Sequence, residues 1–167
     1  MKKILVCLMA MIFLVSASQA VQYQQKVGPW SLDFESSNNF STSIAEGTGH
    51  RIMAFEDKLN NSSVVFTLFS FDKPRDDTYM RILFGLYAKA NQLESQTNNS
   101  IVIEGTEGIQ AYGYSKKNNA IWHGATWPYK PYTNSTTRAN STDDLIILES
   151  INLNQAQFQE IADSLHL

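Results

Sequence analysis

Apolar and polar residues alternate along much of the chain, which is the pattern of β-strands with one buried face. The clearest example is the segment in which Trp30, Leu32 and Phe34 alternate with polar residues. The same pattern predicts three further strands, over residues 40–46, 50–58 and 63–71. The last of these is apolar on both faces, so we expect it in the centre of a sheet. We expect it to end at Pro74, because proline cannot donate a hydrogen bond to a strand ladder.

A three-stranded antiparallel meander is predicted between Ser100 and Trp127. Its strands are expected over 101–103, 109–114 and 121–127, with turns over 105–108 and 116–119. The second turn contains Asn118 and Asn119, and Asn tolerates the left-handed backbone that tight hairpins need. We expect this meander to set the register of the rest of the sheet.

Helical spacing of apolar residues occurs twice. The first stretch is 79–93, and it follows the pair Asp76-Asp77, whose carboxylates favour the start of a helix. The second lies at the C-terminal end, where Asn154 and Gln157 have the spacing of a capping box. A short apolar strand over 145–148 precedes it.

The order of these elements predicts an α+β fold. We expect a mostly antiparallel β-sheet with a long central helix and a C-terminal helix, both packed on one face of the sheet. The 17-residue segment 128–144 is rich in polar residues and is predicted to be a loop.

Residues 1–20 have the pattern of a secretory signal peptide. Two lysines precede an apolar run over 4–15, and small residues up to Ala20 suit cleavage after that position. The run is short for a bilayer span, which needs about 20 residues, and an uncleaved anchor helix is the alternative. We therefore expect a single domain over 21–167, secreted or at the cell surface, with no membrane span after cleavage. Its Gln-rich start, 21–27, is predicted to be a frayed leader.

The composition of the chain argues against several kinds of site and partner. Cys7 is the only cysteine and would leave with the signal peptide, so we expect no disulfide, thiolate metal site or cysteine nucleophile in the mature chain. The chain has 13 basic and 16 acidic residues, and the largest basic clusters are pairs such as Lys116-Lys117. Without a basic stripe, nucleic acid is not expected as a partner.

Metal sites and cofactors are not expected either. His50, His123 and His166 lie far apart, and none has a second ligand at metal spacing, so His123 is interpreted as a packed residue of the sheet rather than a ligand or a base. The acidic group around Pro74 (Asp72 and Asp76-Asp77) offers a calcium site as an alternative to helix capping. Interleaved basic residues and the lack of a calcium-loop glycine favour capping.

No catalytic residue is predicted. The chain contains no Gly-x-Ser-x-Gly motif and no glycine-rich phosphate loop. The sequence does not exclude a pair of carboxylates for glycoside cleavage, because such pairs assemble only in the folded protein.

Aromatic residues gather where the predicted meander ends. Trp122, Trp127, Tyr129 and Tyr132 run from a strand into a proline-containing segment, a pattern that can form a sugar-stacking or protein-binding surface. The alternative is that the tryptophans belong to the core and the tyrosines pack over the edge of the sheet.

Six Asn-x-Ser/Thr triplets are candidate glycosylation sites in an exported protein. All are expected in turns or loops, and they begin at Asn39, Asn60, Asn61, Asn98, Asn134 and Asn140.

Three segments together resemble the short secreted PsbP-like proteins of methanogenic archaea. These segments are VGPWSLDF, IEGTEGIQAYGY and DDLIILESINLNQAQFQEIADSLHL. The family shares the fold of the PsbP extrinsic subunit of photosystem II. The resemblance implies that fold and an archaeal source, and it implies no activity, because fold does not determine function.

The sequence therefore predicts a secreted or cell-surface, non-catalytic domain that binds a partner protein or a component of the cell envelope. The alternative is a secreted hydrolase or a small-ligand binding protein whose site is assembled across the sheet.

Overall fold

A computed structural model describes residues 20–28, 30–130, 132–133 and 140–167. The predicted signal peptide lies outside these residues, apart from its last position. The strands are β1 (Val21–Val27), β2 (Trp30–Ser36), β3 (Ser41–Gly47), β4 (His50–Asp57), β5 (Ser62–Asp76), β6 (Leu93–Ile103), β7 (Thr106–Ser115), β8 (Ala120–Tyr129), β9 (Tyr132–Thr133) and β10 (Asn140–Ile151). The helices are α2 (Asp77–Ala90) and α3 (Gln155–Ser164). Among the described residues, neither helix has the length and apolar character needed to cross a bilayer.

Most of the strands form one antiparallel sheet of eight strands. Its order is β3-β4-β5-β10-β8-β7-β6, and β9 pairs with β10. β10 lies in the centre because Leu145–Leu148 is apolar on both faces, and all four of its side chains are buried. β1 and β2 form a separate hairpin.

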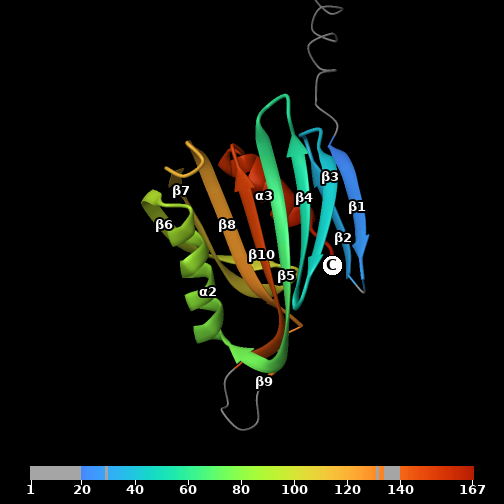
Figure 1. The fold of residues 1–167 in the computed structure, drawn as a ribbon, viewed down its shortest axis with the longest axis vertical. Helices are drawn as coiled ribbons and strands as arrows, with labels where there is room; N and C mark the ends of the chain where they lie inside the picture. The colour runs from blue at the N-terminus through green and yellow to red at the C-terminus, as the bar shows by residue number, and fades with distance from the viewer. Residues whose placement is uncertain (1–19, 29, 131, 134–139) are drawn as a thin grey trace, which may run out of the picture.

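The two faces of the large sheet are covered differently. α2 lies against one face, where Phe84 contacts the Trp122 ring. α3 and the β1–β2 hairpin lie against the other face, where Phe158 stacks on His123. Trp122 and His123 are consecutive in β8, so their side chains point to opposite faces. Figure 1 shows the resulting layers, with α2 and α3 on the two sides of the sheet.

The larger hydrophobic core lies between the sheet and the hairpin. Its centre is Phe34, fully buried, with its ring 5.2 Å from Tyr23, 4.9 Å from Phe55 and 5.5 Å from Phe66 (centroid distances). Tyr23 also uses its hydroxyl, which donates to the Asn38 carbonyl at 2.7 Å. The hairpin is therefore part of the core.

The predicted fold class is wrong. Strands dominate the described residues, and there is no long central helix among them: α2 has 14 residues and α3 has 10. α2 ends because Asn91 caps it and the chain after it joins the sheet as β6. The two helices also lie on opposite faces, whereas the prediction places both on one face.

Three local predictions also fail. Residues 21–27 form β1 and are not a frayed leader. β5 continues past Pro74 to Asp76, because Pro74 lies in a register shift between β5 and β10, where no ladder hydrogen bond is required of it. Part of the predicted 128–144 loop belongs to β9 and β10.

Other local predictions are confirmed. β6, β7 and β8 form the antiparallel meander, with the left-handed Asn119 (φ 51°) in its second turn. The capping box of α3 is present, with Asn154 Oδ1 accepting from the Gln157 amide at 3.0 Å and Gln157 Oε1 accepting from the Asn154 amide at 3.0 Å.

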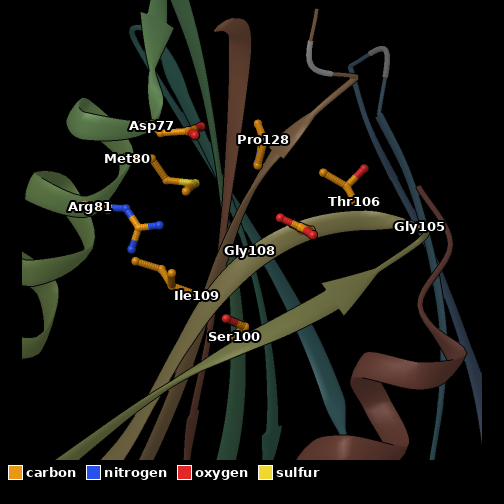
Figure 2. Close-up of a pocket in the computed structure, with 10 residues that line it drawn as sticks. Asp77, Met80, Arg81, Ser100, Gly105, Thr106, Gly108, Ile109 and Pro128 are labelled. Carbon is orange, nitrogen blue, oxygen red and sulfur yellow. The ribbon is translucent and has the colours of Figure 1, made fainter. Parts of the chain in front are cut away.

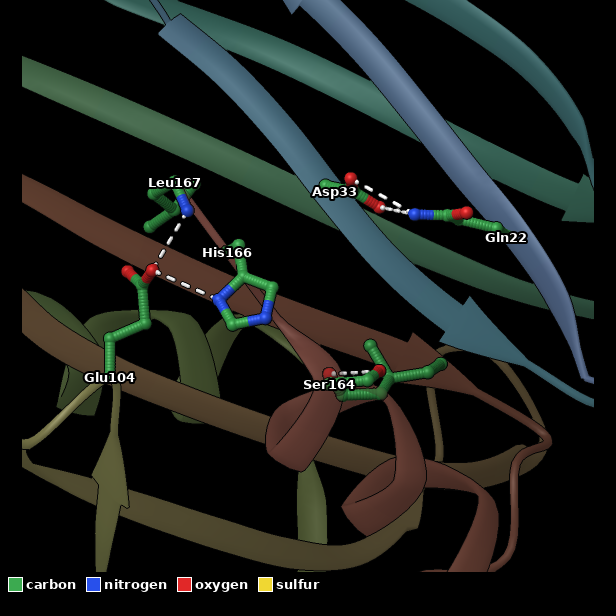
Figure 3. A network of polar contacts seen from close by, with 7 residues as sticks. Gln22, Asp33, Glu104, Ser164, His166 and Leu167 are labelled. Atoms are coloured by element: carbon green, nitrogen blue, oxygen red, sulfur yellow. Dashed lines mark hydrogen bonds and ion pairs between the residues drawn. The ribbon is translucent and has the colours of Figure 1, made fainter.

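The chain after α3 is tied to the hairpin and to the meander. His166 exchanges backbone hydrogen bonds with Asp33 of β2, at 2.9 and 2.7 Å. Glu104 Oε1 accepts from the Leu167 amide at 2.9 Å and lies 3.7 Å from the His166 ring (Figure 3). These contacts tie the chain after α3 to β2 and to the turn between β6 and β7.

Candidate functional site

Each end of α2 leaves a hollow between the helix and the sheet. The hollow at the N-terminal end has a volume of about 270 Å³, and the one at the C-terminal end about 280 Å³. The two hollows differ in the burial of their charged groups.

The N-terminal hollow is lined by exposed charges. Figure 2 shows Asp77, Met80 and Arg81 reaching from α2 toward β7 and β8. Asp77, Arg81 and Glu107 all lie at the surface. Water therefore solvates these groups, and the hollow gives a ligand little advantage over solvent.

The C-terminal hollow contains a partly buried carboxylate, Glu149 of β10. Its Oε1 accepts two hydrogen bonds, one from the Trp122 indole N–H at 3.1 Å and one from the Asn91 side-chain amide at 3.1 Å. No described residue donates a hydrogen bond to Oε2. The carboxylate thus has one oxygen held by the described part of the protein and one that is not.

The Trp122 indole is placed by the pairing of β8 with β10. Glu149 lies directly opposite Gly124 in that ladder. Trp122 and Gly124 are on the same face of β8, two residues apart, and the Trp122 ring lies across the bare Cα of Gly124. The glycine therefore leaves the space through which the indole N–H reaches Glu149.

Asn91 is held from several directions at the C-terminal end of α2. Its side-chain amide also donates to the Tyr87 carbonyl at 3.0 Å, and its Oδ1 accepts from the Asn118 amide at 2.9 Å. Its backbone carbonyl accepts from the Ser115 hydroxyl at 2.8 Å. These bonds join α2 to the β7–β8 turn and fix the donor that faces Glu149.

Burial raises the pKa of the Glu149 carboxyl above its usual range, while the Trp122 and Asn91 hydrogen bonds and the charge of Lys117 act to lower it. Burial also raises the pKa of the Tyr87 hydroxyl, and the nearby Glu149 charge raises it further. Tyr87 is therefore a neutral hydroxyl at physiological pH.

The walls of this hollow combine apolar and polar side chains from three strands, one helix and one turn. Besides Glu149, Trp122, Tyr87 and Asn91, its lining comprises Ser63, Val65, Ala90, Lys117, Asn118 and Ile151. We call these ten residues the Glu149 pocket. A pocket with apolar walls and a few fixed polar groups is the general form of a small-ligand site.

The predicted aromatic surface is not brought together by the fold. Trp122 and Trp127 are buried on opposite faces of β8. Tyr129 is partly buried, with its ring 4.6 Å from Trp30 and the Lys130 ammonium 4.7 Å from its centroid. The side chain of Tyr132 lies outside the described residues. A binding role for these four residues stays a prediction, and two of them have core positions.

The three histidines also stay apart. His123 is buried between the Tyr112 and Phe158 rings, and burial lowers its pKa. His50 and His166 lie nearer the surface. The described residues contain no group of three His, Cys, Asp or Glu side chains arranged for a metal ion.

The acidic group before α2 caps the helix. Asp76 is the N-cap, and its Oδ1 accepts from the Tyr79 amide at 3.0 Å. Asp72 and Asp77 are at the surface, and Asp77 contributes a negative charge to the first turn. This geometry agrees with the prediction that the acidic group caps the helix.

Four of the glycosylation candidates have described side chains, and all four are exposed: Asn39, Asn60, Asn61 and Asn98. Asn60 donates to the Asp57 carboxylate at 2.6 Å, and Asn98 accepts from Gln96 at 2.5 Å. Asn98 lies within β6 and Asn140 is the first residue of β10, so neither is in a loop as predicted. Asn134 and the side chain of Asn140 lie outside the described residues. Glycan occupancy stays a prediction.

The Glu149 pocket is not among the sites that the sequence predicts. The available signal was a glutamate directly after the apolar run 145–148, which places a carboxylate inside a predicted buried strand. Its partners could not be identified, because Asn91 is 58 residues away and Trp122 is 27 residues away.

No protein-family model matches this chain, and no curated protein matches it. The resemblance to secreted PsbP-like proteins therefore stays a prediction.

Proposed function

We propose that the protein is an exported, non-catalytic binding domain whose Glu149 pocket takes a small ligand with a protonated amine and an apolar part. The single observation behind this proposal is the position of the Glu149 carboxylate. One of its oxygens is held by Trp122 and Asn91, and the carboxylate lines a hollow of about 280 Å³.

Charge favours a cation in this pocket. Removing a carboxylate from water is costly unless an opposite charge or hydrogen-bond donors compensate it. The two neutral donors on Oε1 compensate only in part, since burial still raises the pKa of Glu149. The C-terminal end of α2, which lines the same pocket, adds the partial negative charge of a helix terminus.

Lys117 does not occupy the place of this cation. It is exposed on the β7–β8 turn, and among the described residues it forms no ion pair with Glu149 within 4.0 Å. Its charge lowers the pKa of Glu149 and so favours the ionised carboxylate that an amine would bind. Trp122, Val65 and Ile151 would contact the apolar part of the ligand.

The pocket supports binding better than hydrolysis. Glu149 is the one carboxylate among its described lining residues, and general acid–base hydrolysis of a glycoside uses two. The sequence pattern of residues 1–20 supports export. The predicted docking of a partner protein or an envelope component remains a separate proposal that this pocket does not address.

Isothermal titration calorimetry with small amines tests the proposal. The probes are the protonated forms of propylamine, isobutylamine and piperidine, with propanol as a neutral control of similar size. We expect at least one cation to bind and propanol not to bind. Because a hydrogen bond to a charged group contributes about 1.5–3 kcal/mol, Glu149→Gln should weaken binding by about tenfold or more.

Glu35→Gln is the matched control, because Glu35 is an exposed glutamate on β2, at the other face of the sheet. It should bind the same probe as the wild type does. Absence of binding for all three cations, or equal affinity in the Glu149→Gln variant, would refute the proposal.

A further inference from the structure

Three stacked rings run from α3 across β8 to β7, on the face opposite the Glu149 pocket. Phe158 and His123 stack with centroids 5.2 Å apart and planes 26° apart. His123 and Tyr112 stack with centroids 5.6 Å apart and planes 17° apart. The inner two rings are buried, whereas Tyr112 is 38% exposed. The stack therefore ends in an aromatic side chain that is open to solvent.

Two more apolar side chains extend this surface. Tyr114 lies on the same face of β7 as Tyr112, and it pairs with Ile121 of β8 as Tyr112 pairs with His123. Tyr114 is 41% exposed and Ile121 is 47% exposed. Tyr112, Tyr114 and Ile121 lie outside the buried core on this face, which contains α3 and the hairpin.

These side chains form the floor of a groove of about 430 Å³. We call it the Tyr112 groove. Its remaining lining comes from Glu94 and Gly113 on the sheet side and from Asn154 and Gln155 at the start of α3. An aromatic floor thus meets amide groups along one wall.

The described side chains give this groove little net charge. Glu94 is paired with Lys116, at 2.6 Å between carboxylate and ammonium. Burial lowers the pKa of His123, so its ring is neutral at physiological pH. A charged ligand would meet no unbalanced opposite charge among the described lining residues, and the groove is better suited to a neutral ligand with hydrogen-bonding groups.

We propose that the Tyr112 groove binds a neutral carbohydrate, with the apolar face of one pyranose ring on Tyr112. The C–H groups of a pyranose face bury apolar area against an aromatic ring, and its hydroxyls donate and accept hydrogen bonds at the edge. The amides of Asn154 and Gln155 lie on the wall that such hydroxyls would meet. This site is independent of the amine site, since the two lie on opposite faces of the sheet.

Saturation-transfer difference NMR tests the proposal. The probes are the methyl glycosides of glucose, galactose, mannose and N-acetylglucosamine, at millimolar concentration. We expect saturation transfer to the ring C–H protons of at least one glycoside. Tyr112→Ala should reduce its affinity by about fivefold or more, because the stacking surface is lost.

Two variants serve as controls. Tyr79→Ala removes a tyrosine of α2, on the opposite face, and should leave the transfer unchanged. Glu149→Gln should also leave it unchanged, which separates this site from the amine site.

A third variant keeps the test valid if Tyr112→Ala fails to fold. Tyr112→Leu keeps an apolar side chain in the groove while removing the ring, and it should lose binding as Tyr112→Ala does. No transfer to any of the four glycosides, or equal transfer in a folded Tyr112→Leu variant, would overturn the proposal.

Discussion

Replacing Gly124 by Ala should destabilise the protein strongly and disturb the Glu149 pocket at the same time. A Cβ at this position would lie 2.5 Å from Cζ2 of the Trp122 indole, and Cη2 is closer still. The buried ring would have to move, and its N–H would leave Glu149. Overpacking costs about 1–3 kcal/mol and a buried group left without its hydrogen bond costs about 1–3 kcal/mol, so we expect a loss of about 2–6 kcal/mol in the free energy of unfolding.

Urea-induced unfolding measures this loss, and Gly85→Ala is its control. Gly85 lies in α2, and a Cβ built there meets no atom within 4 Å. Alanine is favoured over glycine in a helix by about 1 kcal/mol, so this variant should be as stable as the wild type or more so. If Gly124→Ala were as stable as Gly85→Ala, the Trp122 ring could not lie where the structure places it.

Replacing Phe34 by Ala should remove about 3–5 kcal/mol from the free energy of unfolding. Phe34 is fully buried, and it joins the β1–β2 hairpin to β4 and β5 through the Phe55 and Phe66 rings. Its truncation leaves a cavity where the hairpin meets the sheet. The measurement is again the urea midpoint at constant m-value.

Val102→Ala provides the comparison, because Val102 is a strand residue that is 59% exposed. It should change stability by less than about 0.5 kcal/mol. A loss below about 1 kcal/mol for Phe34→Ala would mean that the hairpin contributes little to the core. That result would contradict the central place of the Phe34 ring among Tyr23, Phe55 and Phe66.

The alternation of apolar and polar residues predicted most strands, because in these strands every second side chain is buried. In β2, Trp30, Leu32 and Phe34 are buried and the residues between them are not. β1 has the same alternation in a weaker form, with Tyr23 and Val27 buried, but its glutamines suggested a frayed segment. The ring of Tyr23, which packs on Phe34, makes this segment a strand.

β6 shows why an edge strand is difficult to predict. Its residues 96–100 are polar, and those with described side chains are exposed, so no hydrophobic period marks them. They form a strand because the backbone pairs with β7, and that pairing is a long-range property of the sheet. The spacing of apolar residues also overestimates the length of the first helix. It continues past Asn91, where the chain instead pairs with β7 as part of β6.

The candidate site could not be predicted, because it depends on arrangements that no local pattern specifies. Glu149 faces Trp122 only because β10 pairs with β8 in one register, opposite Gly124. Asn91 reaches Glu149 only because α2 packs on the face of the sheet that carries Trp122 and ends beside Glu149. The sequence does not indicate which face of the sheet a helix covers, and its pattern favoured the same face for both helices.

The indole N–H signal of Trp122 offers the most direct test of the amine site. The chain has three tryptophans, so a ¹H–¹⁵N spectrum contains three indole signals, and Trp122→Phe assigns one of them. Titration with the amine that binds best should shift the Trp122 signal and leave those of Trp30 and Trp127 in place, because those two lie on the other face. A Trp122 signal that does not move, or three signals that move alike, would contradict an amine site at Glu149.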